Sequence, residues 1–102
     1  SERIMGTVNS IEEITASDDD KEEYLESVDT SSDEYNYASA YRFANYVIYL
    51  NNGPGNTLPC FINTTEDLLP KEGDKISLIG EHFSYDYSDY INAENSAIYI
   101  FK

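Results

Sequence analysis

Two short aromatic segments hold the side chains best suited to binding chemistry in this sequence. One is Tyr41-Arg42-Phe43, in which a guanidinium group lies between two rings. The other runs from Phe83 to Tyr90, where aromatic residues alternate with serine and aspartate. Aromatic rings stack on nucleic-acid bases, and tyrosine also gives a large contact area in protein interfaces. The candidate partner-binding residues are Tyr41, Arg42, Phe43, Phe83, Tyr85, Tyr87 and Tyr90.

Residues that could perform catalysis are scarce. The only histidine is His82, and the only cysteine, Cys60, lies in an apolar run that favours a buried structural thiol. The segment Asn51–Asn56 is rich in glycine, but it lacks the Lys-Ser/Thr pair that completes a phosphate-binding loop. The sequence therefore predicts no catalytic residue, no enzyme activity and no cofactor.

Carboxylates are abundant without forming a recognisable metal site. Asp18-Asp19-Asp20 could attract Ca²⁺ or Mg²⁺ weakly, but the spacing, central glycine and terminal glutamate of an EF-hand loop are absent. We predict no metal site.

The net charge of the chain distinguishes between a protein and a nucleic acid as the binding partner. The chain has 20 acidic and 6 basic residues, a formal net charge of -14. Proteins that bind nucleic acid draw much of their affinity from phosphate neutralisation, which an acidic chain forfeits. A negative surface instead steers basic partners toward the protein. The charge thus favours a protein partner, with a basic protein among the candidates, and disfavours nucleic acid.

The pattern of apolar and turn residues predicts five strands. Alternating or β-branched runs bounded by Gly, Pro and Asn are typical of strands, and Thr64–Leu69 followed by Pro70 predicts a short helical turn. A bend is expected near Asn9-Ser10 in the first strand. The predicted strands cover residues 3–14, 40–50, 57–63, 75–83 and 91–101.

An acidic insertion separates the first two predicted strands, at about residues 17–38. Its few sizeable apolar side chains cannot offset the entropy of ordering so long a segment, which predicts a mobile loop. The alternative is a helix of one or two turns around residues 19–28, because Ser17 and Asp20 resemble a capping box and Tyr24, Leu25 and Val28 have helical spacing.

The length of 102 residues predicts one domain, residues 1–102. No apolar run is long enough to cross a bilayer as a helix. The compartment stays unknown: the cytoplasm is slightly favoured, and an export signal or lipid anchor upstream of Ser1 remains open.

The order of these elements resembles an OB-fold, a five-stranded Greek-key barrel with a short helical turn between strands 3 and 4. The chain is similar to OB domains of the "tRNA anti-like" type, mostly of unassigned function, from residue 3 onward except for the acidic insertion. The matching residues are Cys60, Ile62, Leu68, Leu69, Gly73, Asp74, Ile76, Leu78, Gly80 and the final Ile98–Phe101. The resemblance implies an all-β barrel and leaves the activity open.

Three functions follow from these observations. The favoured one is a non-catalytic binding module that recognises a protein partner through an acidic, tyrosine-rich surface. The first alternative is single-stranded nucleic-acid binding by an aromatic strand face, in which Arg42 joins the stack unless the acidic insertion competes for it. The second is an acidic nucleic-acid mimic that inhibits a DNA-binding protein.

Overall fold

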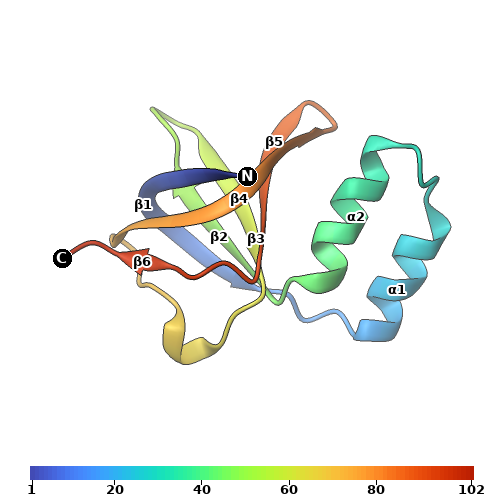
Figure 1. The fold of residues 1–102 in the computed structure, drawn as a ribbon, viewed down its shortest axis with the longest axis horizontal. Coiled ribbons are helices and arrows are strands. Elements are labelled where there is room, and N and C mark those ends of the chain that lie inside the picture. Colours follow the sequence, from blue (N-terminus) through green and yellow to red (C-terminus); the bar gives the residue numbers. More distant parts are fainter.

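The strands of the chain enclose a barrel, and two helices lie side by side at one flank of it, with α2 (Asp33–Phe43) next to the barrel and α1 (Asp18–Ser27) on the outer side of α2 (Figure 1). The computed structural model describes all residues, 1–102. In chain order the elements are β1 (Glu2–Glu13), α1 (Asp18–Ser27), α2 (Asp33–Phe43), β2 (Tyr46–Asn51), β3 (Thr57–Ile62), the 3-10 turn η1 (Glu66–Leu68), β4 (Lys75–Tyr85), β5 (Ser88–Glu94) and β6 (Tyr99–Ile100).

Pairing closes the barrel in the order β1-β2-β3-β5-β4, because β4 also pairs with β1. The first half of β1 pairs with β4 and the second half with β2. A register shift between Val8 and Ser10 bends the strand at the predicted place. β3 and β5 are parallel, whereas the neighbouring pairs are antiparallel. The predicted all-β, five-stranded barrel with a helical turn between strands 3 and 4 is confirmed.

The barrel interior is filled by side chains that alternate along the strands. Ten buried apolar residues form this core, and partly buried neighbours such as Ile4 and Ile11 pack against it. Cys60 is among them, fully buried, so the expectation of a buried thiol is confirmed. The ten are Val8, Ile48, Leu50, Leu58, Cys60, Ile62, Ile76, Leu78, Ile91 and Ala93.

The turn before β4 is tied to the bend of β1. Gly73 has a φ of 91°, a left-handed conformation that glycine adopts without strain. Its N–H donates to the Val8 carbonyl at 2.9 Å, and the Val8 N–H donates to the Asp74 carbonyl at 2.8 Å. The Asp74 carboxylate accepts a further bond from the Lys71 N–H at 2.8 Å. This turn therefore holds two strands of the barrel in place.

The predicted second strand is wrong over its first part. The sequence predicts a strand over residues 40–50, whereas β2 begins at Tyr46 and residues 40–43 are the last turn of α2. The Ser32 side chain caps α2 by accepting from the Tyr35 N–H at 3.3 Å. Two acids in the first turn and Arg42 in the last favour the helix through its dipole.

The acidic insertion is helical rather than mostly unstructured. α1 covers nearly the range given for the alternative short helix, and the Ser17 hydroxyl accepts from the Asp20 N–H at 3.1 Å. Three aspartates in its first turn are favourable at the positive end of the helix dipole. The expectation of a loop fails because each helix has its own serine cap and α2 packs against the barrel.

The predicted last strand is divided in two. β5 ends at Glu94, which has a φ of 49°, and the chain resumes as the two-residue strand β6. β6 pairs with Ile76 and Ser77 of β4, so it extends the sheet beside the closed barrel.

Candidate functional site

Aromatic side chains join α2 to the outer face of the barrel. Tyr37 is at the centre, with its ring centroid 5.0 Å from that of Tyr85, 5.4 Å from Tyr90 and 5.5 Å from Phe61. Buried Ala40 belongs to the same cluster and lets the helix approach closely. This cluster covers side chains that alternate with the core residues of β2, β3 and β5, so α2 occupies that face of the sheet.

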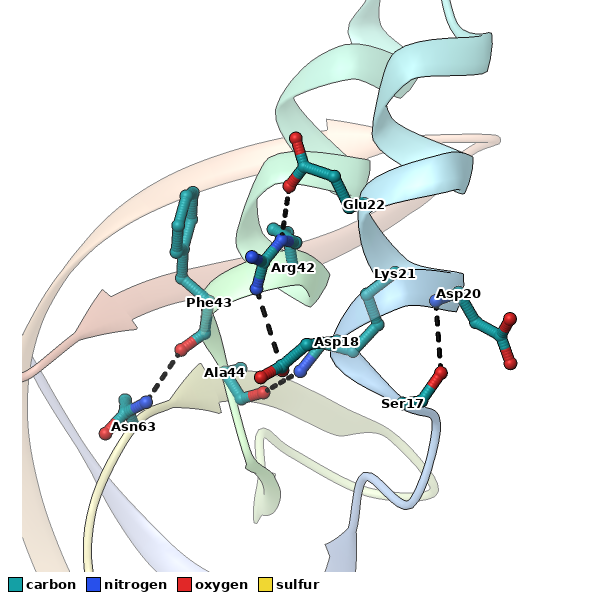
Figure 2. A network of polar contacts seen from close by, with 9 residues as sticks. All are labelled: Ser17, Asp18, Asp20, Lys21, Glu22, Arg42, Phe43, Ala44 and Asn63. Atoms are coloured by element: carbon teal, nitrogen blue, oxygen red, sulfur yellow. Dashed lines mark hydrogen bonds and ion pairs between the residues drawn. The ribbon is translucent and has the colours of Figure 1, made fainter.

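Polar contacts hold α1 against α2 (Figure 2). Arg42 donates from Nε to Glu22 Oε2 at 2.6 Å, and its Nη1 lies 3.7 Å from Asp18 Oδ1. Buried Lys21 donates from Nζ to the Ala44 carbonyl at 2.7 Å. Burial lowers the pKa of Lys21, while nearby Asp18 acts in the opposite direction. Two of the six basic residues are therefore occupied within the helical pair.

The first predicted binding segment lies on α2 and not on a strand. Arg42 forms ion pairs with two acids of α1. The acidic insertion therefore binds the guanidinium group that a nucleic-acid stacking patch would need. Tyr41 is half-buried and packs edge-on to Tyr24, with 6.3 Å between ring centroids. Phe43 is exposed at the end of the helix, with the Arg42 guanidinium 5.2 Å from its ring centroid. These residues do not form a stacking platform on the barrel.

The second predicted segment forms a two-stranded hairpin at the opposite end of α2. Phe83 pairs with Tyr90, and Tyr85 pairs with Ser88 across a two-residue turn. The turn residues Asp86 and Tyr87 have φ values of 52° and 64°, the left-handed conformations of a type I′ turn. Tyr87 is fully exposed at the tip.

A pocket and a cleft adjoin this hairpin. The aromatic pocket, of about 290 Å³, lies between α2 and the barrel. The acidic cleft, of about 510 Å³, shares Tyr85, Asp86 and Asp89 with it and adds Asp33 from the start of α2. Residues lining the aromatic pocket are Tyr37, Tyr49, Pro59, Phe61, Tyr85, Asp86, Ser88, Asp89 and Tyr90. Neither space is lined by lysine, arginine or histidine.

Tyr90 is the one predicted hairpin residue that is buried rather than surface-exposed, at 3% of its accessible area. Its hydroxyl is buried without a hydrogen-bond partner. Burial, with smaller contributions from Tyr37 and Asp33, raises the pKa of Tyr90 to about 12. This phenol therefore leaves one donor and one acceptor unsatisfied beside the pocket.

Sequence reasoning missed Tyr37 and Asp33, because both were assigned to an unstructured loop. The signal that could have found them is the run Ser32-Asp33-Glu34, a serine cap followed by acids, with Tyr37 and Tyr41 one helical turn apart.

The two residues considered for nucleophilic chemistry are separated by a strand. Cys60 of β3 and His82 of β4 both pair with Ile91 of β5, which lies between them. His82 is on the surface, 3.6 Å from an oxygen of Asp89 and 3.9 Å from one of Glu2. Burial raises the pKa of the Cys60 thiol to about 12, which opposes formation of the thiolate.

Replacing Cys60 by alanine is expected to reduce the loss of stability at alkaline pH. The unfolded thiol ionises near its ordinary pKa of 9.0, whereas the folded thiol stays neutral up to about 12, so its contribution to stability falls as pH rises through this window. Between pH 8 and pH 10 the parental chain should lose about 1.4 kcal/mol more than Cys60→Ala. Urea unfolding of both proteins at the two pH values measures this difference. Equal losses would show that the thiol does not titrate differently in the folded state.

No group of three or more His, Cys, Asp or Glu residues is arranged to hold a metal ion. Neither helix has the length and apolar character needed to cross a membrane. Fold and site thus define a closed five-stranded β-barrel with a helical pair inserted between its first two strands and an acidic, aromatic hairpin beside that pair. No protein-family model, curated protein or solved structure gives a significant match to this chain.

Proposed function

We propose that the chain is a non-catalytic, OB-fold-like binding module that recognises a basic protein partner through the β4–β5 hairpin and the start of α2. The observation that carries the proposal is Tyr87, a fully exposed aromatic residue in a left-handed conformation. Such a conformation is unfavourable for a residue other than glycine, and strain of this kind concentrates at functional sites. The hairpin surrounds it with Asp86, Asp89 and Tyr85.

Single-stranded nucleic acid is the weaker proposal on two grounds. OB-folds bind oligonucleotides on the face of strands 2 and 3, and here α2 packs on that face through Tyr37 and Phe61. A single-stranded nucleic acid that passes the hairpin would also bring its phosphates toward Asp33, Asp86 and Asp89.

The test is fluorescence anisotropy with two labelled probes, an arginine-rich Gly/Ser peptide and a single-stranded DNA of mixed sequence. We expect saturable binding of the peptide that weakens as salt is raised, and no binding of the DNA. Competition by duplex DNA for a basic DNA-binding protein would support the mimic alternative instead. Binding of DNA without binding of the peptide would overturn the proposal.

Tyr87→Gly separates function from stability in this test. Asp-Gly is a preferred pair for a type I′ turn, so the variant should be more stable by about 1 kcal/mol in urea unfolding. Loss of the exposed ring should at the same time weaken peptide binding several-fold. Glu66→Gln, on the exposed turn η1, serves as the surface control. A stabilised variant with unchanged peptide affinity would contradict a binding role for Tyr87.

A further inference from the structure

We propose that the aromatic pocket beside the β4–β5 hairpin binds one cationic side chain, an arginine or lysine of the partner. This inference rests on the proposed function and assigns it a ligand chemistry and a position. The pocket is the space of about 290 Å³ between α2 and the barrel. That volume is at the small end for ligand sites, which suits a single long side chain better than a large molecule.

The walls of the pocket attract positive charge. The partly exposed rings of Tyr37, Tyr49 and Tyr85 come from α2, β2 and β4, so they face the space from different elements. The face of an aromatic ring is electron-rich and attracts ammonium and guanidinium groups. Pro59 and Phe61 add apolar surface against which the methylene stem of the side chain packs.

The Tyr90 hydroxyl is the second, independent feature. Tyr90 is a lining residue of the pocket and is only 3% exposed, and its hydroxyl is buried without a hydrogen-bond partner. A buried polar group without a partner is unfavourable, and occupation of the pocket by an N–H donor removes that penalty. The phenol oxygen is a suitable acceptor for a guanidinium or ammonium N–H.

Carboxylates at the mouth set the sign of the ligand. Asp86 and Asp89 line the pocket, and Asp33 lines the adjoining cleft. Asp86 makes no ion pair in the structure, so its charge is not neutralised from within the chain. A nucleotide base could enter an aromatic pocket, but its phosphate would face these three acids. A cation is favoured by both the rings and the carboxylates.

The experiment is an NMR titration of the ¹⁵N-labelled chain with three Gly/Ser peptides that contain three arginines, three lysines or three citrullines. Citrulline keeps the shape of arginine without its charge. We expect the two cationic peptides to shift amide signals of α2 residues 33–37 and of the 83–90 hairpin, and the citrulline peptide to give no shifts. Equal binding of the citrulline peptide would overturn the proposal.

Two variants locate the site. Tyr90→Phe removes only the unpartnered hydroxyl, so it should fold normally and weaken the cationic peptides roughly tenfold, as expected for a hydrogen bond to a charged group. Asp86→Asn keeps the turn geometry and should weaken them about threefold, in the range of a partly exposed charge pair. Asp67→Asn removes the same charge from η1 and should change affinity by less than twofold.

The outcomes distinguish the two proposals. Peptide binding that maps to the tip of the β4–β5 hairpin and is unaffected by Tyr90→Phe would overturn the pocket proposal and leave the hairpin surface as the site for a basic partner. No binding of either cationic peptide would overturn both.

Discussion

Replacing Gly80 by alanine is expected to lower the free energy of unfolding by about 3 kcal/mol, the upper part of the range for overpacked cores. An added Cβ would overlap the Ile91 side chain and lie 3.0 Å from the Asn92 carbonyl oxygen. Ile91 is fully buried and the carbonyl belongs to the backbone, so neither can move away easily. Urea unfolding followed by far-UV circular dichroism gives the difference.

The position of Gly80 explains why the space is so tight. Up to Gly80, β4 pairs with β1, and from Glu81 onward it pairs with β5. The strand therefore changes partner at this residue, where neighbouring backbones approach closely as the sheet closes into a barrel.

Two further variants test that explanation. Glu81→Ala, at the adjacent exposed position, should change the free energy of unfolding by no more than about 0.5 kcal/mol. Adding Ile91→Leu to Gly80→Ala removes the overlapping methyl group and should recover part of the loss. A Gly80→Ala variant within 1 kcal/mol of the parental protein would show that the barrel adjusts to the added methyl group.

How far the sequence predicts this fold depends on where the determining contacts lie. The barrel strands were predictable because turn residues such as Gly73-Asp74 and the apolar alternation around Ile76 and Leu78 are local signals. α2 was not predictable, because the aromatic residues around Tyr41 and Phe43 have high β propensity. In the folded chain, contacts with barrel residues that are distant in sequence outweigh this propensity. The Ser32 cap was a local signal for the helix, and the strand pattern obscured it.

The candidate site shows the same division. The hairpin from Phe83 to Tyr90 could be selected from its composition alone. That Tyr90 is buried and that Tyr37 reaches it depend on packing between residues more than 50 positions apart in the chain. Apolar and charged patterning specifies which face of an element is buried, and it does not specify which element covers that face.

The second large effect is expected at Tyr37, whose replacement by alanine should release the helical pair from the barrel. Its ring contacts Phe61, Tyr85 and Tyr90, which no other single side chain of α2 does. Loss of a partly buried aromatic residue with several ring contacts lowers stability by about 3 kcal/mol. The bonds of Lys21 and Arg42 lie within the pair or at its junction with β2, so they hold α1 to α2 rather than α2 to the hairpin.

Hydrogen exchange of backbone amides measures the release of the helical pair from the barrel. In Tyr37→Ala, amides of α1 and α2 should exchange much faster, while those of β3 and β5 change little, because local opening reports the least stable unit. Tyr35→Ala removes the same group from a half-buried position of the same helix and should have the smaller effect. Cationic peptide binding should weaken as well, because Tyr37 is a wall of the pocket. Equal acceleration in strands and helices would show instead that the helical pair and the barrel unfold as one unit.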